Sequence, residues 1–329
     1  MWIYRQVYLI KKYLWVRRFS TTDMCRIISV GNISMGGTGK TPFVIYLCRE
    51  LLHRGFRVCV LSRGHKGKIG LGTNIIYDGE KFLVDKKLAA DEPFLIAQKL
   101  QNVPVITGKD RVKSFKLAVE RFSPDFVVMD DAFQHRKIHR DIDIVLLDHS
   151  NPVSTGFVFP FGYLREMPKN LQRADIVVFT RAKAQTVPDK VKRYVKSKPV
   201  FFSHIVVDGF YFKGEKFPRD VVQNYKFYAF SGVASNRKFF KMLTEKNISV
   251  TASRSFPDHH IYNKKDFACL TAGLKKSGAE YLITTEKDYV KLSDELKNKT
   301  FYTAISTRLN NELAFWNSVF EKCEKPEKA

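Results

Sequence analysis

A glycine-rich turn near the N-terminus contains residue types that bind a nucleotide's phosphate chain. An apolar run over 27–33 leads into this turn, and a helical pattern follows over 43–52. Glycines let backbone N–H groups approach a phosphate, and a helix N-terminus adds partial positive charge. The candidate nucleotide-binding residues are Ser34, Met35, Gly36, Gly37, Thr38, Gly39, Lys40 and Thr41.

The spacing assigns separate roles to the last two residues of this turn. Lys40 is placed to reach the β- and γ-phosphates, and the Thr41 hydroxyl to ligate Mg²⁺. Ser34 stands where the usual motif has glycine, so Gly36, Gly37 and Gly39 must provide the flexibility. The alternative is a structural turn, but the flanking strand and helix favour a phosphate-binding loop.

A second group of chemical residues ends the apolar run at 126–129. Asp130 and Asp131 follow that run directly, and a carboxylate at such a strand end commonly holds Mg²⁺ in phosphate-loop proteins. Asp130 is the first candidate, and Asp131 could share the metal ion or orient its ligands. The alternative is that the pair caps the turn after the strand.

Two further acidic clusters have more than one interpretation. Asp91 and Glu92 begin a helical segment, where acids commonly cap the helix or compensate its dipole. Asp91 could instead accept a proton from an attacking hydroxyl. The segment 256–262 contains Asp258, His259 and His260, a combination that serves in catalysis and in helix capping alike.

Short β-branched runs alternate with helical stretches over the first two thirds of the chain. This alternation predicts an α/β fold, a mostly parallel sheet with helices on both faces and a phosphate-binding loop after its first strand. Ligands of such sheets bind at the carboxyl ends of the strands. The expected strands are 27–33, 58–62, 103–107, 126–129, 142–147, 176–180 and 200–205.

The pattern loosens over 206–225 and then resumes. We therefore expect a nucleotide-binding domain over 21–205, a linker over 206–225 and a smaller α/β domain over 226–329 that closes over the active cleft. The expected strands of the smaller domain lie at 226–230, 249–255, 281–285 and 301–305.

Composition narrows the classes of partner. The chain has 329 residues, with 56 basic and 33 acidic residues and a net charge of +23. Such an excess indicates an anionic partner: a nucleic acid, an acidic membrane or a phosphorylated substrate. No nucleic-acid-binding motif accompanies the charge. The scattered cysteines indicate a reducing compartment, and no run is long enough for a membrane-spanning helix.

Residues 1–20 have the pattern of an amphipathic helix. Ile3, Val7, Ile10 and Leu14 share one helical face, and tryptophans and tyrosines surround them, as at a lipid headgroup interface. Membrane contact and packing on the nucleotide-binding domain are equally consistent with this pattern.

Taken together, the ordered motifs resemble the tetraacyldisaccharide 4′-kinase (lipid A 4′-kinase) family over nearly the whole chain. They are VGNISMGGTGKTP at 30–42, SRG at 62–64, GKDR at 108–111, DDAFQH at 130–135, LRE at 164–166, FPDHH at 256–260 and TTEKD at 284–288.

The resemblance implies an activity, a location and further site residues. It implies transfer of the ATP γ-phosphate, with Mg²⁺, to the 4′-hydroxyl of a lipid A disaccharide 1-phosphate acceptor. It places the enzyme on the anionic cytoplasmic surface of the inner membrane as a peripheral protein, with no nucleic acid and no obligate protein partner. It makes Asp91 the proton acceptor, assisted by His259. Arg165 becomes an active-site residue and Glu166 a possible Mg²⁺ ligand.

Two other classes share parts of this pattern. Membrane-associated ATPase switches of the Min/Par kind have a similar glycine loop, but carry a lysine before the two glycines where this chain has Met35. A nucleotide-binding module that acts on nucleic acid would fit the charge, but it leaves Asp91, Asp130 and His259 without a role.

Overall fold

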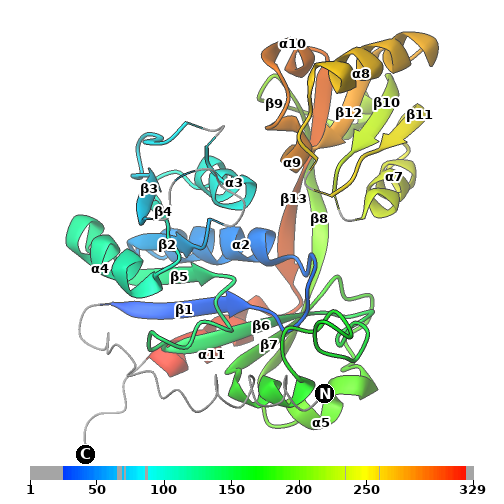
Figure 1. Cartoon of the computed structure of the whole chain (residues 1–329). Coiled ribbons are helices and arrows are strands. Elements are labelled where there is room, and N and C mark those ends of the chain that lie inside the picture. Colours follow the sequence, from blue (N-terminus) through cyan, green and yellow to red (C-terminus); the bar gives the residue numbers. More distant parts are fainter. Residues whose placement is uncertain are drawn as a thin grey trace, which may run out of the picture. The chain divides into compact units, whose positions relative to one another are not determined.

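The computed structural model describes residues 25–64, 69, 72–85, 88–233, 235–258 and 260–323. The expected helix over 1–20 and the candidate His259 lie outside these residues. The chain forms two compact units (Figure 1). Unit 1 comprises Met1–Ser203 and Leu309–Ala329, and unit 2 comprises His204–Arg308.

Unit 1 is built on the predicted sheet. Its strands are β1 (Arg26–Gly31), β2 (Val58–Ser62), β3 (Asn74–Tyr77), β4 (Val105–Thr107), β5 (Phe126–Asp130), β6 (Ile142–Asp148), β7 (Ile176–Thr180) and the first part of β8 (Val200–Phe212). They lie in the order β8-β7-β6-β1-β5-β2-β4-β3. Neighbouring strands are parallel except for the β3–β4 pair. This confirms the predicted α/β fold with a mostly parallel sheet.

Helices cover both faces of this sheet because its strands are apolar on both sides. On β5, Val128 packs in the core formed with α2 (Lys40–His53), α3 (Asp91–Lys99) and α11 (Glu312–Cys323). Its neighbours Val127 and Met129 pack on the other face with α4 (Arg111–Phe122). Further along that face, β6 and β7 pack with the short helix η1 (Pro168–Arg173) and with α5 (Asp189–Val195).

Helix α11 belongs to unit 1, although its residues were expected in the smaller domain. Phe315 contacts Phe43 of α2 edge-on, with ring centroids 6.0 Å apart, and the Trp316 indole donates a hydrogen bond to the Tyr46 hydroxyl. The expected boundary at 226–329 therefore differs from the observed units. The apolar side of α11 is buried on the sheet of unit 1, a long-range pairing that local patterns do not reveal.

Unit 2 has its own parallel strands, β10 (Lys226–Ser231), β11 (Ser249–Ser255), β12 (Tyr281–Thr285) and β13 (Thr300–Leu309). Helices α7 (Asn236–Glu245) and α8 (Lys264–Lys276) pack in separate apolar cores. The short helices are α9 (Glu286–Tyr289) and α10 (Asp294–Lys297).

The segment 206–225 differs from the expected linker. It contains the end of β8, the strand β9 (Glu215–Phe217), which pairs antiparallel with β8, and the helix α6 (Arg219–Gln223). Phe212 stacks on Phe301 of β13 with ring centroids 4.6 Å apart. The segment 206–225 therefore forms a hairpin at the edge of the sheet. Its charged side chains face solvent, and its aromatic rings pack against the core of unit 2.

No helix in the described part of the chain is both long and apolar enough to cross a lipid bilayer.

A close backbone approach fixes the turn that follows β1. A Cβ atom on Gly31 would lie 2.6 Å from the Cβ of Phe133 and 2.7 Å from its backbone nitrogen. The Ala132 N–H donates to the Val30 carbonyl and holds the segment after β5 against β1. Glycine is therefore required where the chain leaves β1 for the phosphate loop.

We expect Gly31→Ala to lower the free energy of unfolding by about 1–3 kcal/mol, the usual cost of forcing extra volume into a packed site. Gly72→Ala is the matched control, because a Cβ there meets no atom within 4 Å. Urea unfolding of both variants measures the difference. Equal stability of the two would show that the chain relaxes around Gly31 without cost.

Candidate active site

The glycine-rich loop joins β1 to α2 at the carboxyl edge of the sheet, as predicted. Gly39 precedes α2 in the left-handed conformation, with φ 80°, which glycine adopts without strain. Within the described residues no side chain caps α2, whereas Asp110 caps α4. Met35, Gly36 and Gly37 are exposed. The first N–H groups of α2 are thus left for an anion at an open loop.

Three hydrogen bonds brace this loop from different parts of unit 1. The Asn32 side-chain amide donates to the Thr38 hydroxyl at 3.0 Å, and the Thr180 hydroxyl, at the end of β7, donates to the Thr38 carbonyl at 2.9 Å. The Met35 N–H donates to the Tyr163 carbonyl at 2.7 Å. The rest of unit 1 therefore braces the loop at Met35 and Thr38, although its outer glycines face solvent.

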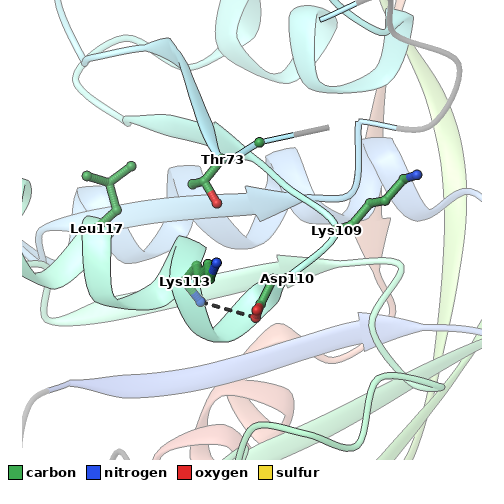
Figure 2. Close-up of a pocket in the computed structure, with 6 residues that line it drawn as sticks. Thr73, Lys109, Asp110, Lys113 and Leu117 are labelled. Atoms are coloured by element: carbon green, nitrogen blue, oxygen red, sulfur yellow. Dashed lines mark hydrogen bonds between the residues drawn. The ribbon is translucent and has the colours of Figure 1, made fainter. Parts of the chain in front are cut away.

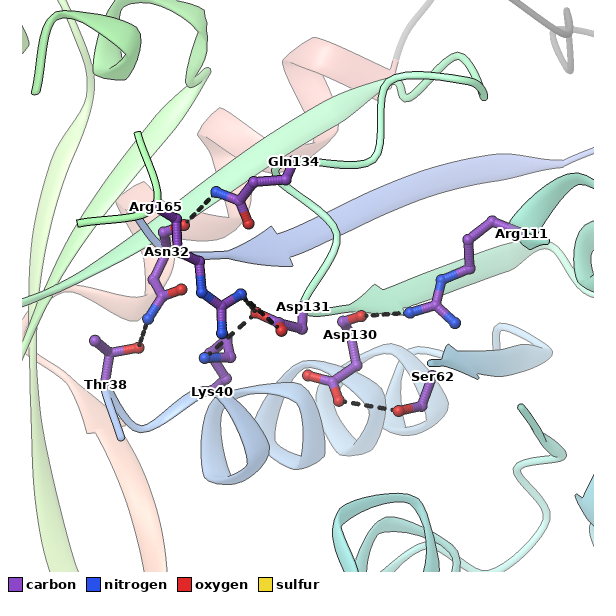
Figure 3. Close-up of polar contacts among 9 residues, drawn as sticks. All are labelled: Asn32, Thr38, Lys40, Ser62, Arg111, Asp130, Asp131, Gln134 and Arg165. Atoms are coloured by element: carbon purple, nitrogen blue, oxygen red, sulfur yellow. Dashed lines mark hydrogen bonds and ion pairs between the residues drawn. The ribbon is translucent and has the colours of Figure 1, made fainter. Parts of the chain in front are cut away.

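Asp130 ends β5 as a buried carboxylate with only 2% of its surface exposed. One carboxylate oxygen accepts a hydrogen bond from Ser62 at 3.3 Å, while the other is buried without a hydrogen-bond partner among the described residues. Arg111 donates to the Asp130 backbone carbonyl at 2.9 Å (Figure 3). A buried carboxylate oxygen left open in this way is suited to a cation.

Burial raises the pKa of Asp130 to about 7, and the charges of Glu92 and Asp131 act in the same direction, against Lys40 and Arg111. Burial likewise lowers the pKa of Arg111 to about 10, so its guanidinium stays charged at neutral pH. Such a shift in a carboxylate beside a phosphate-binding loop is typical of a functional site.

Asp131 lies at the centre of a second set of charges. Lys40 Nζ is 3.4 Å from one of its oxygens, and Arg165 Nη1 contacts both oxygens at 2.8 and 2.9 Å (Figure 3). Burial alone would raise the pKa of Asp131, but Lys40 and Arg165 together hold it below its usual value. The phosphate-loop lysine is thus directed toward the strand that carries both aspartates.

Glu166 lies next to Arg165 in the chain but has partners of its own. It is buried, accepts a hydrogen bond from Asn170 at 2.7 Å, and pairs with Arg173 at 2.9 Å. Among the residues that the structure describes, no three His, Cys, Asp or Glu side chains gather as a metal-binding group. A cation here would therefore rely on one or two protein ligands and on the phosphates themselves, as Mg²⁺ commonly does.

Asp91 is the first residue of α3, and Ala90 occupies the capping position. No side chain in the described part of the chain caps this helix, so Asp91 does not serve as its N-cap. Glu92, the next residue, raises the pKa of Asp130 through its charge, which places the start of α3 near the Asp130 carboxylate. Asp91 thus begins a helix beside the site.

The polar cluster of unit 2 is organised around His260. Its ring shares a hydrogen bond with Asp266 at 2.9 Å and stacks on Phe256 with centroids 4.7 Å apart. Asp258 pairs with Lys287 at 3.6 Å. The His260 ring is thus held within unit 2 by Asp266 and Phe256, while His259 lies outside the described residues.

A hollow of about 410 Å³ opens beside α4 and is lined by Gly72, Thr73, Lys109, Asp110, Lys113 and Leu117 (Figure 2). Asp110 accepts hydrogen bonds from the backbone N–H groups of Val112 and Lys113. Because Asp110 already engages this helix terminus, the hollow offers a poorer phosphate site than the start of α2.

Sequence reasoning about individual residues missed several members of the site. Arg111, with 3% of its surface exposed, and the hydroxyl of Ser62 both contact Asp130. Asn32 and Thr180 shape the loop at Thr38. Each lies at or just after the end of a strand, or begins the next helix, at the same edge of the sheet. That position is the signal by which they could have been found.

The two aspartates should affect stability in opposite ways. Because its pKa is raised in the folded protein, Asp130 stabilises the fold below its unfolded pKa near 3.8, and this contribution is lost as pH rises to about 7. We expect Asp130→Asn to raise the unfolding midpoint at pH 8, by removing a cost on the order of 4 kcal/mol, and to change it little at pH 4.

Asp131→Asn is the matched control. Its lowered pKa means that its contribution is present above the unfolded pKa and is lost only as pH falls below it. This variant should therefore lower the midpoint at pH 8. Thermal unfolding across this pH range checks both, and a midpoint for Asp130→Asn below wild type at pH 8 would contradict the raised pKa.

Comparisons with known proteins bear on the whole chain. The family model described as tetraacyldisaccharide-1-P 4′-kinase matches residues 1–324. A tetraacyldisaccharide 4′-kinase of Syntrophus aciditrophicus is 37% identical over 317 residues, covering 90% of this chain and 84% of that protein. The protein of the same name from Geobacter metallireducens is 40% identical over 273 residues, covering 82% and 79%.

A solved structure agrees with these relatives. The crystal structure of LpxK from Aquifex aeolicus in complex with ATP matches with a TM-score of 0.78 and 31% identity, covering 98% of this chain and 94% of that one. The motifs at 30–42 and 130–135, which the sequence singled out, are the segments that form the site described above. This chain belongs to the tetraacyldisaccharide-1-P 4′-kinase family.

Proposed function

We propose that this chain transfers the γ-phosphate of ATP to the 4′-hydroxyl of tetraacyldisaccharide 1-phosphate and so forms lipid IVA. The observation that carries the proposal is the cluster at the ends of β1 and β5. There Lys40 and Arg165 meet the start of α2 and a buried carboxylate; among the described residues, no side chain caps that helix and one oxygen of the carboxylate has no hydrogen-bond partner. These are the parts that phosphoryl transfer requires: donors for phosphate oxygens and a carboxylate for a cation.

ATP binds with its phosphates on the loop 34–41. The N–H groups at the start of α2 face the phosphate oxygens, and Lys40 exchanges its contact with Asp131 for the β- and γ-phosphates. Arg165 keeps the charge of Asp131 balanced during this exchange, because it contacts both carboxylate oxygens. Most of the catalytic effect then comes from positioning and charge neutralisation.

Mg²⁺ fits the residues present. The open oxygen of Asp130 and the hydroxyl of Thr41 would hold the ion, and Asp131 and Glu166 are the remaining candidate ligands. The existing contacts of Glu166 with Arg173 and Asn170 favour Asp130. When bound, the ion would neutralise charge on the phosphates. Asp130 must be ionised for this role, and the charges of Lys40 and Arg111 act on its pKa in that direction.

Asp91 accepts the proton of the 4′-hydroxyl, assisted by His259. The sugar oxygen then forms its bond to the γ-phosphorus as the bond from that phosphorus to the β–γ bridging oxygen breaks, and ADP leaves. Asp91 begins α3, and the charge of the adjacent Glu92 acts on the Asp130 carboxylate, which supports this role. The acceptor is a membrane lipid, so the enzyme works as a peripheral protein on the anionic cytoplasmic surface of the inner membrane. The excess of basic residues suits that surface.

The defining test is transfer of labelled phosphate from γ-labelled ATP to tetraacyldisaccharide 1-phosphate in detergent micelles. We expect label in the lipid with the wild-type protein, and a loss of at least about 10²-fold with Lys40→Ala, which removes a charge from the transferring phosphate. ATP hydrolysis without lipid product would contradict the proposed acceptor and favour an ATPase switch.

The general-base role of Asp91 makes a separate prediction. Asp91→Asn should lower kcat by about 10²–10⁴-fold and leave the ATP dissociation constant unchanged, because general-base catalysis acts on the chemical step. Glu92→Gln is the matched control, since it removes the neighbouring acid from the same helix terminus. Similar losses in both variants would instead indicate that the acids act through the helix dipole.

Substitutions of His259 and His260 should have different effects on activity and stability. His259→Ala should lower kcat while thermal stability stays unchanged. His260→Ala should lower stability, because it removes the contacts with Asp266 and Phe256. Turnover under saturating substrates and thermal unfolding together distinguish them, and a full rate for His259→Ala would exclude its assistance to Asp91.

A further inference from the structure

A loop between β6 and η1 exposes an unusual concentration of aromatic side chains. Phe157, Phe159, Phe161 and Tyr163 are 66, 56, 72 and 61% exposed. Elsewhere in the described part of the chain the next most exposed phenylalanine is Phe82, at 39%. We call residues 155–163 the aromatic loop. Exposed aromatic groups gathered in this way mark a contact surface.

The loop is charge-free in a highly charged protein. No Asp, Glu, Lys or Arg occurs between Asp148 and Arg165, although 27% of the chain is charged. Exposed loops of soluble proteins normally carry charges, which keep them in water. The composition of this loop favours a partner that accepts apolar and aromatic groups without matching charges.

Backbone hydrogen bonds hold the aromatic loop in one conformation. Phe159 N–H donates to the Leu164 carbonyl at 2.9 Å, and Leu164 N–H donates to the Phe157 carbonyl at 3.0 Å. The Tyr163 N–H donates to the Thr155 hydroxyl at 2.9 Å. A Cβ on Gly162 would lie 2.3 Å from that hydroxyl oxygen, so the turn is tightly closed. The aromatic side chains therefore project from a loop whose backbone is fixed by hydrogen bonds.

The same loop is joined directly to the phosphate-binding loop. Met35 N–H donates to the Tyr163 carbonyl, and Arg165 N–H donates to the Ile33 carbonyl, both at 2.7 Å. Met35 is itself exposed. Whatever surface receives the aromatic loop will also lie next to the residues that bind phosphate.

We propose that the aromatic loop docks into the interfacial layer of a lipid bilayer. Phenylalanine rings leave water when they enter the boundary between headgroups and acyl chains, and a tyrosine there keeps its hydroxyl hydrated. The exposed Lys169 and Lys183 follow the loop and the neighbouring strand β7, and the net charge of +23 suits an anionic leaflet. The docked loop brings the phosphate-binding loop to the membrane surface, where a lipid acceptor resides. Only this last step rests on the proposed function.

Vesicle binding tests the docking without ATP or acceptor, so its outcome is independent of kinase activity. The probe is vesicles of phosphatidylethanolamine and phosphatidylglycerol, with the full chain and co-sedimentation as readout. Phe161→Ser should weaken binding about tenfold, and Phe157→Ser with Phe161→Ser about a hundredfold, as expected when apolar side chains no longer leave water. Phe161→Trp should retain full binding.

Leu313→Ser is the matched control, because Leu313 lies in unit 1, on α11, and is 76% exposed. It should bind vesicles like the wild type, and every variant should keep the wild-type unfolding midpoint. Equal vesicle affinity for the double variant and the control would overturn the proposal. So would a loss of self-association in sedimentation equilibrium without loss of vesicle binding, which would assign the loop to a second copy of the chain.

Discussion

Asp130 and Asp131 follow one another at the end of β5, the first buried and the second half-buried. Two adjacent carboxylates can stay together there only if other segments compensate their charge. Lys40 and Arg165 supply charge to Asp131, while Arg111 holds the backbone of Asp130. These partners come from the starts of α2 and α4 and from the segment before η1. The contacts that compensate the two carboxylates leave one oxygen of Asp130 without a hydrogen-bond partner among the described residues. The stability of the fold and the chemistry of the site therefore depend on the same arrangement of charges.

The fold of unit 1 was predictable from local patterns because its strands are buried on both faces. Short, continuous apolar runs such as 58–62 and 176–180 are typical of the inner strands of a parallel sheet. The edge strands β3 and β9 were missed, since they are short and carry polar or charged residues. Helix α11 was assigned to the wrong unit because its partners, among them Phe43 and Tyr46, lie far away in the sequence.

The site was predictable in part for a similar reason. Glycine spacing and strand-end acids have a direct chemical meaning, so the loop at 34–41 and the two aspartates were identified from residue types. The buried state of Arg111 was not, because arginine in a sequence normally indicates solvent exposure. The difference between Asp130 and Asp131, one raised and one lowered in pKa, arises from burial and from cations in distant segments, which no local pattern contains.

The place of α11 has a consequence for synthesis on the ribosome. Unit 2 is inserted between β8 and α11, and Phe202 and Asn310 lie side by side, joined by two hydrogen bonds at 2.9 Å. Residues 204–308 must therefore be made before the sheet of unit 1 can be fully covered. Until then the apolar faces of Phe43 and Tyr46 lack their final partner, while unit 2 already contains all the strands of its own core. The nascent chain thus contains every residue of unit 2 before it contains every residue of unit 1.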